Sequence, residues 1–167
     1  GVTVFKIEGR ARGAEYVKTV VECYKDAIKS VIDGTYSEDK ISKWDSRLSE
    51  VFNRGFWNGY YLGQRLGEWS HNYGSQATLR KVYVGKVTNY FKNIGVAEFL
   101  MEAQALHKGD RILVTGATTG AYEAVAEDIR LEDGTSADDV SKGMVFSMKT
   151  SETLHRNDKL YKLLVDS

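Results

Sequence analysis

The amino-acid sequence predicts an α+β protein in which a short strand and a helical hairpin precede a small antiparallel β-barrel. Between residues 16 and 52, apolar side chains recur every three or four positions, which is the period of amphipathic helices. After residue 79 the chain changes to short runs of β-branched and aromatic residues. Glycine, asparagine and aspartate separate these runs, as is typical of strands joined by tight turns.

The helical part begins with residues 1–7, a run that is apolar on both sides and indicates a short strand covered on both faces. A helix of about five turns is expected over residues 16–31, closed by the Asp33-Gly34 pair. A second helix is expected to start after Ser37, because serine followed by two acids is a favourable helix start. The sequence therefore predicts a hairpin of two helices.

Six strands are expected in the second part, at residues 81–87, 94–101, 111–115, 122–131, 144–148 and 159–165. Before them lies a polar stretch rich in glycine, serine and asparagine, which is typical of a linker. We therefore divide the chain into a first region at residues 1–67, a linker at residues 68–79 and a barrel domain at residues 80–167.

Composition narrows the functional classes. With 42% hydrophobic and 28% charged residues, the chain is typical of a globular protein, and no apolar run reaches membrane-spanning length. The start of the chain lacks the layout of a secretion signal, and the single cysteine, Cys23, rules out an internal disulfide framework. A cytoplasmic protein without a membrane partner is expected.

The formal net charge of zero hides an uneven distribution. Residues 80–111 carry six basic and three acidic side chains, whereas residues 112–140 carry one arginine and seven acids. No chain-wide field attracts nucleic acid, but a local basic surface on the barrel is possible from this pattern.

Two motifs in the first region resemble collagenase-like peptidase family U32. One is the run Lys6-Ile7-Glu8-Gly9-Arg10, followed by the pair Tyr16-Val17 at the start of a helix. The other is Arg54-Gly55-Phe56, followed by Gly59-Tyr60. Both occur in the order and spacing of the carboxy-terminal part of the family's catalytic barrel region.

The second region resembles the family's carboxy-terminal extension, which is similar to the second domain of elongation factor Tu. The residues that carry this resemblance are Val84-Gly85-Lys86-Val87, Lys108-Gly109-Asp110, Lys142-Gly143 and the run from Asn157 to Tyr161. The resemblance implies that the chain is the carboxy-terminal piece of a larger enzyme and is inactive by itself.

Two functions follow from the resemblance, and a third class stays open beside them. The full-length protein is expected to act in the hydroxylation of RNA, transfer RNA in particular, with an iron–sulfur cluster and prephenate as cofactors that this piece does not itself hold. It could instead be a genuine peptidase or collagenase that binds its substrate with the barrel. A third possibility is a non-catalytic protein-interaction module. The implied partners are RNA or a peptide, together with the upstream catalytic barrel of the same protein.

Glu8 and Arg10 are the candidate catalytic residues. They follow the expected strand and precede a helix, which in a parallel barrel places side chains at the mouth where chemistry occurs. A carboxylate there could act as an acid or base, and an arginine could hold a carboxylate or phosphate. The alternative is an ion pair that only closes the rim of the barrel.

Two further groups are candidates for binding. Arg54, Gly55, Phe56, Gly59 and Tyr60 form either a binding loop or, as we favour, an aromatic plug with a packing role. Basic and aromatic residues also alternate in the first barrel strands, where they could contact phosphates and stack on RNA bases: Lys81, Tyr83, Lys86, Tyr90 and Lys92. A solvated strand face is the alternative for this second group.

Metal and nucleophilic chemistry find little support. His71, His107 and His155 lie far apart in the sequence, so no metal site is expected. Cys23 lies beside the apolar stripe of a helix and is expected to be a buried, unreactive thiol.

Overall fold

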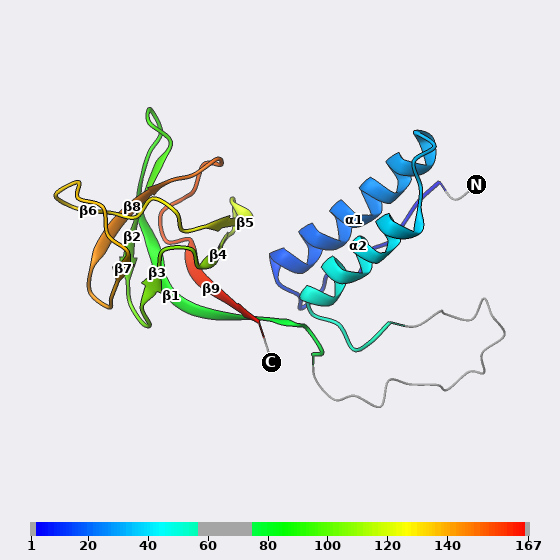
Figure 1. Cartoon of the computed structure of the whole chain (residues 1–167), viewed down its shortest axis with the longest axis horizontal. Coiled ribbons are helices and arrows are strands. Elements are labelled where there is room, and N and C mark those ends of the chain that lie inside the picture. The colour runs from blue at the N-terminus through cyan, green and yellow to red at the C-terminus, as the bar shows by residue number, and fades with distance from the viewer. Residues whose placement is uncertain (1–2, 57–74, 166–167) are drawn as a thin grey trace. The chain divides into compact units, whose positions relative to one another are not determined.

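The computed structural model describes residues 3–56 and 75–165, which fall into two compact units (Figure 1). The first unit extends to Leu79, and the second comprises Arg80–Val165. Only residues 75–79 of the expected linker are described. There, the backbone N–H groups of Gln76 and Thr78 donate to carbonyls of the first unit at 2.8 and 3.0 Å. No helix in the described ranges is long and apolar enough to cross a membrane.

The first unit is the expected pair of helices, α1 (Ala14–Ile32) and α2 (Glu38–Glu50). Helix α1 ends at Ile32 with Asp33 as its C-cap, and Gly34 follows in the left-handed region with φ of 67°. Helix α2 is capped by the Ser37 side chain, which accepts a hydrogen bond from the backbone N–H of Lys40 at 3.4 Å. Both helix boundaries predicted from the sequence are therefore confirmed.

Two contacts between polar side chains connect the helices beside a small buried interface. The Trp44 indole N–H donates to Asp26 at 2.9 Å, and Arg47 pairs with Glu22 at 2.7 Å. Val20 and Cys23 of α1 are buried against α2 together with the Trp44 ring. One face of α1 is thus used by the hairpin.

The prediction of a strand at residues 1–7 is wrong for residues 3–7, the described part of that run. Residues 3–9 form no strand, and Val4 and Phe5 are 79% and 52% exposed. A strand is defined by hydrogen bonds to a neighbouring strand, and the described residues provide none for this segment. Instead, the Phe5 ring lies 6.2 Å from the Tyr24 ring of α1, measured between centroids.

The second unit is built from nine strands. They are β1 (Leu79–Phe91), β2 (Val96–Met101), β3 (Leu106–His107), β4 (Arg111–Gly116), β5 (Gly120–Val125), β6 (Arg130–Leu131), β7 (Asp139–Val140), β8 (Val145–Lys149) and β9 (Lys159–Val165). Seven form one sheet in the order β5-β4-β9-β1-β2-β8-β6, and β3 pairs with β7. The pairs β1–β2, β2–β8, β4–β5, β4–β9 and β6–β8 are antiparallel.

The sheet curls around a single core but is not a closed barrel, because no ladder joins the end strands β5 and β6 (Figure 1). The single strand expected at residues 122–131 is interrupted between β5 and β6. In this interval Ala126 and Ile129 are completely buried. The backbone leaves the sheet there to place these two side chains in the core.

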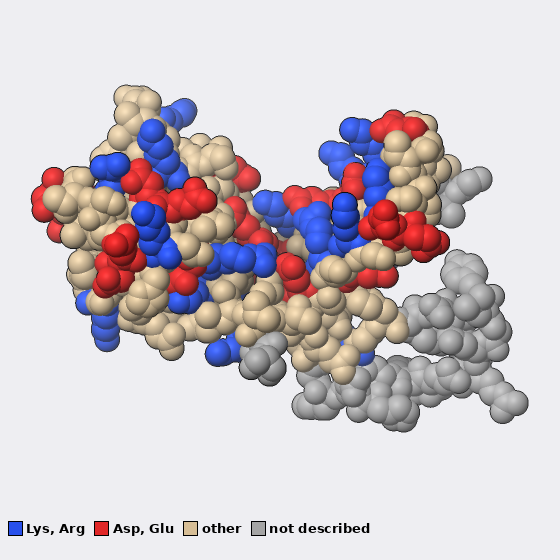
Figure 2. Space-filling model, in the orientation of Figure 1, with Lys and Arg blue, Asp and Glu red and all other residues tan. Residues whose placement is uncertain are grey.

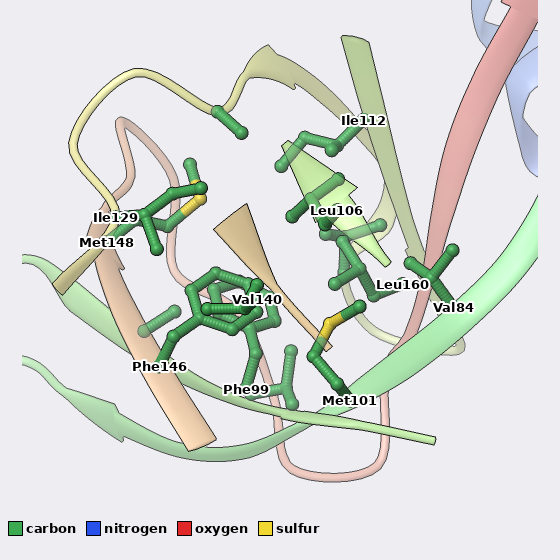
Figure 3. Close-up of a cluster of buried hydrophobic side chains, with 14 of the residues drawn as sticks. Val84, Phe99, Met101, Leu106, Ile112, Ile129, Val140, Phe146, Met148 and Leu160 are labelled. Atoms are coloured by element: carbon green, nitrogen blue, oxygen red, sulfur yellow. The ribbon is translucent and has the colours of Figure 1, made fainter. Parts of the chain in front are cut away.

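The core is continuous and apolar, and its central feature is an aromatic pair (Figure 3). The rings of Phe99 and Phe146 stack with centroids 5.0 Å apart, and both side chains are almost fully buried. Met101, Leu106 and Leu160 complete the surrounding layer. Strands β1 and β2 approach closely at Gly85, where a Cβ atom would lie 2.2 Å from the Leu100 carbonyl oxygen.

Candidate functional site

Glu8 and Arg10 lie on an exposed turn that leads into α1. The Glu8 carboxylate accepts a hydrogen bond from the backbone N–H of Arg10 at 2.9 Å. The N–H of Arg12 donates to the carbonyl of Gly9 at 3.0 Å and closes the turn. The observed contact of Glu8 therefore orders the backbone, and a catalytic role for Glu8 and Arg10 stays a prediction.

A hollow of about 400 Å³ lies in the first unit, between the start of α1 and the chain that follows α2. Its lining combines cationic and aromatic side chains: Arg12, Arg54, Tyr16, Tyr24, Phe52 and Phe56. The described lining contains no carboxylate. The Arg12 guanidinium carbon lies 3.8 Å from the centroid of the Phe52 ring. A stacked guanidinium keeps its N–H edges available to an anion while its face is held by the ring.

The second family motif forms part of this hollow. The backbone N–H of Gly55 donates to the Asn53 side chain at 3.1 Å, and Gly55 has φ of 89°, a conformation that favours glycine. This turn brings Arg54 and Phe56 to the lining, and Phe56 remains 62% exposed. Gly59 and Tyr60 lie outside the described residues.

Arg12 is the residue that the sequence analysis missed. It lies two positions beyond the Lys6–Arg10 motif, and its role depends on contact with Phe52, which is 40 positions away. The available signal was its place between the motif and Gly13, just before α1. Tyr16 of the first motif and Arg54 and Phe56 of the second motif thus line the same hollow as Arg12, which belongs to neither motif.

In the second unit, three of the predicted RNA-binding residues lie in one group, which we call the strand cluster: Lys81, Tyr83, Lys86, Glu102 and Tyr161. Lys81 Nζ lies 5.3 Å from the centroid of the Tyr161 ring, and the rings of Tyr83 and Tyr161 meet edge to face at 5.7 Å. Lys86 pairs with Glu102 at 2.7 Å, and the Tyr83 hydroxyl donates to the same carboxylate. The charge of Lys86 is thus largely offset by Glu102.

The other two predicted residues lie elsewhere on β1 and its turn. Tyr90 packs against the core, while Lys92 is exposed in the turn after β1. Lys81 and Lys92 are 11 positions apart, up to about 36 Å along an extended strand at 3.3 Å per residue. On the face shown in Figure 2, basic and acidic side chains are interspersed. The five residues therefore do not form one basic patch.

The strand cluster makes a pH prediction. The hydrogen bond that the Tyr83 hydroxyl donates to Glu102 is the main reason that the pKa of Tyr83 rises from its ordinary 10.0 to about 12. Because the folded-state pKa is raised, the contribution of Tyr83 to stability is complete below pH 10 and is lost as the pH rises toward 12. The difference between tyrosinate absorbance titrations of the parent chain and Tyr83→Phe should show one group ionising near pH 12. Glu102→Gln should move this ionisation to lower pH, and an unchanged midpoint would contradict the assignment.

The described residues contain no group of three histidine, cysteine or acidic side chains able to hold a metal. Cys23, the one cysteine of the chain, is 2% exposed, and burial is the main cause that raises the pKa of its thiol. Iron–sulfur clusters are held by several thiolates. The residues of this chain therefore do not fit such a cluster, which would have to be held by other parts of a larger protein.

His155, Asp158 and Thr119 are brought together although they are distant in the sequence. The His155 backbone N–H and the Thr119 hydroxyl both donate to Asp158, at 2.7 and 2.5 Å, and Thr119 Oγ1 lies 2.8 Å from His155 Nδ1. The hydroxyl proton is thus directed to the carboxylate and not to the imidazole. This arrangement differs from a catalytic triad, in which the carboxylate orients the histidine. It ties the β4–β5 turn to the loop before β9.

The family motifs agree with a comparison against known protein families. Residues 1–71 match the model of peptidase family U32. The two motifs at the hollow, to the extent that they are described, thus lie in the U32 region, and the resemblance inferred from the sequence is confirmed.

Relatives match nearly the whole chain. A protein named collagenase from Porphyromonas gingivalis strain W83 is 56% identical over 162 residues, which cover 97% of this chain and 39% of the relative. An uncharacterized protease, MJ0090, from Methanocaldococcus jannaschii is 33% identical over 162 residues, which cover 95% of this chain and 39% of the protease. The chain thus spans about two fifths of the length of these two relatives.

A solved structure also matches part of the chain. The carboxy-terminal domain of a U32 peptidase from Geobacillus thermoleovorans gives a TM-score of 0.46 at 22% identity. The match covers 48% of this chain and 90% of that domain.

Proposed function

We propose that this chain is the substrate-binding part of a U32-family enzyme that acts on RNA, and that the full-length protein hydroxylates transfer RNA. The observation that carries the binding role is the hollow in which Arg12 stacks on Phe52, next to Arg54 and Phe56. Guanidinium groups bind phosphate, and aromatic rings stack on unpaired bases, which is the combination that single-stranded RNA requires.

The strand cluster offers a second, weaker contact. Lys81 and the Tyr161 ring present a cation beside an aromatic face, but Glu102 offsets Lys86 and adds a negative charge. We therefore expect the hollow to contribute more to RNA affinity than the strand cluster does. Each contact of this kind adds affinity without reading sequence, because phosphates position a nucleic acid and do not specify it.

Catalysis is expected to need the rest of the full-length protein in addition to Glu8 and Arg10 of this chain. The described ranges contain no group of three histidine, cysteine or acidic side chains that could hold a metal, and Thr119, which lies beside His155, directs its proton to Asp158. Hydroxylation also requires a redox cofactor, and the single cysteine of this chain does not fit an iron–sulfur cluster. The chain by itself should therefore bind substrate without converting it.

Peptide hydrolysis is the second candidate, and the names of the collagenase and protease relatives favour it. The same hollow could receive a carboxylate and an apolar side chain of a peptide. A protein-interaction module is the third candidate. The first two differ in their ligand, so binding of RNA and of gelatin to the same protein separates them.

The test of the binding role is fluorescence anisotropy of labelled bulk transfer RNA with the intact chain. A log–log salt slope of about −2 to −3 is expected, consistent with about three phosphate contacts. The double variant Arg12→Gln and Arg54→Gln should weaken binding about tenfold at low salt and flatten the slope by about one per arginine. Lys142→Gln with Lys149→Gln removes the same charge from exposed positions of the second unit and should have a smaller effect.

Two results would contradict this proposal. One is equal loss of affinity in the control and in the arginine variant, because binding would then follow net charge alone. The other is tight binding or cleavage of gelatin by the chain, lost in the arginine variant, which would favour the peptidase. The hydroxylation step has its own readout: the mass of modified nucleosides in transfer RNA from cells with and without the full-length gene.

A further inference from the structure

The loop that leads into β9 carries two cations and a histidine in one tight turn. His155, Arg156 and Lys159 are all exposed, and we call these three residues the basic turn. The backbone N–H of Asp158 donates to the carbonyl of His155 at 3.0 Å and closes the turn. Among the described residues, neither Arg156 nor Lys159 has an ion-pair partner. The turn therefore presents positive charge that no contacting carboxylate neutralises.

The acid between these residues, Asp158, faces inward. It is 5% exposed, and its carboxylate accepts hydrogen bonds from the Thr119 hydroxyl and from the His155 backbone N–H. Its Oδ1 atom packs so closely on Gly116 that a Cβ atom there would lie 1.7 Å away. The carboxylate is thus buried and engaged, while the cations remain on the surface. A ligand that arrives from solvent meets the cations first.

Hydrogen bonds to two other elements hold the basic turn in place. The backbone N–H of Val87 in β1 donates to the Asp158 carbonyl, and the N–H of Asn157 donates to the Val87 carbonyl, both at 2.9 Å. Thr119 Oγ1 lies 2.8 Å from His155 Nδ1, and the Thr119 proton is directed to Asp158, so Nδ1 is the donor of this contact. These contacts fix the turn before a ligand arrives, and preorganised groups lose less entropy on binding.

We infer that the basic turn binds a phosphate of the RNA backbone and so adds a contact with the substrate on the second unit. This inference rests on the proposed function, because it takes RNA as the ligand. An arginine fork binds two phosphate oxygens, and a lysine supplies a point charge. Arg156 and Lys159 stand three positions apart in one turn, so both can reach one phosphate.

The basic turn is expected to contribute more than the strand cluster. In the strand cluster, Glu102 offsets the charge of Lys86, whereas no such pairing occurs at the basic turn among the described residues. The expected salt dependence also leaves room for this contact. A log–log slope of about −2 to −3 corresponds to about three phosphates. The hollow offers two arginines, Arg12 and Arg54, so the basic turn would supply the remaining contact.

Removal of the two charges is the first test. Arg156→Gln with Lys159→Gln should weaken binding of bulk transfer RNA to the intact chain about fivefold at low salt and flatten the salt slope by about one. The matched control is Lys142→Gln with Lys149→Gln, which removes two charges from other exposed positions of the second unit. Fluorescence anisotropy measures both variants. Equal losses in the two would overturn the inference, because binding would then follow net charge alone.

A change that keeps the charge tests the fixed geometry. Thr119→Val removes the hydroxyl between His155 and Asp158, and it should weaken RNA binding about threefold without changing the salt slope. Thr119→Ser keeps the hydroxyl and should bind RNA like the parent chain. Equal affinities of Thr119→Val and Thr119→Ser would contradict the role of the fixed turn. Thermal unfolding of each variant separates loss of binding from loss of fold.

Amide NMR spectra of the parent chain provide a measurement that needs no substitution. A short single-stranded RNA should shift the signals of residues 155–159 more than those of residues 142–149. The assignment to RNA is overturned by unshifted signals at residues 155–159, or by an equal shift with inorganic phosphate at the same concentration. A shift produced by gelatin and not by RNA would assign the turn to a peptide instead.

The same spectra distinguish failure of this inference from failure of the proposed function. If the variant with Arg12→Gln and Arg54→Gln binds RNA like the parent chain while residues 155–159 still shift, the hollow fails and the basic turn stands. If that variant loses affinity but RNA leaves residues 155–159 of the parent chain unshifted, the basic turn fails and the hollow stands.

Discussion

Phe99→Ala is expected to lower the free energy of unfolding of the second unit by about 3–5 kcal/mol, the usual range for removing a buried phenylalanine. Phe99 is fully buried, and its ring stacks on Phe146 at 5.0 Å between centroids. The substitution removes the ring and leaves a cavity in the core beside the paired strands β2 and β8. Urea denaturation followed through the amide signals of the sheet measures the loss.

Phe91→Ala is the control for this prediction. Phe91 ends β1 and is 41% exposed, so the loss there should be below about 1 kcal/mol. Similar losses at the two positions would mean that the stacked pair is not the centre of the core.

Gly85→Ala is expected to destabilise the second unit by more than about 3 kcal/mol, because it forces two strands apart. A methyl group at this position would lie 2.2 Å from the carbonyl oxygen of Leu100 in β2. That oxygen belongs to the backbone of a paired strand, so no side-chain rotation relieves the contact. The same denaturation experiment measures the effect.

Gly120→Ala separates crowding from backbone strain. Gly120 has φ of 70°, and nothing lies within 4 Å of a Cβ atom built on it. Only the strain of about 1–2 kcal/mol for an L-residue in this conformation applies there. If Gly85→Ala cost no more than Gly120→Ala, the close approach of β1 and β2 would be contradicted.

Local chemistry explains why much of the fold could be predicted from the sequence. The end of α1 at its C-cap Asp33 and the start of α2 after Ser37 depend on residues that act within one turn of themselves. Most strands of the second unit lie between turns that contain Gly109, Gly134 or Gly143, all at positive φ. Such signals need no knowledge of the tertiary structure.

The failures are at places where a distant partner decides the outcome. The run at residues 1–7 has strand composition, but a strand requires a neighbour that composition cannot supply. The two-residue strands β3 and β7 are too short to show any period. The single strand expected at residues 122–131 breaks because two of its side chains turn into the core.

The candidate site was predictable only in part for the same reason. The sequence motif indicated Arg54 and Phe56, but Arg12 joins them through a ring 40 positions away. Alternation of lysine and tyrosine in β1 indicated a basic surface. Glu102, which directly follows the next strand, lowers the positive charge of this surface because it pairs with Lys86. Pairing of this kind is invisible until strand register is known.

The place of β9 in the sheet has a consequence for biosynthesis. This strand lies between β4 and β1, although Leu79 and Lys159, where β1 and β9 begin, are 80 positions apart. A ribosome adds about 5–20 residues per second, so β1 waits roughly 4–16 s for this neighbour. Throughout that interval a 13-residue strand has one unpaired edge. Nascent chains would be most prone to aggregation at this stage, and a chaperone that shields β1 would protect them.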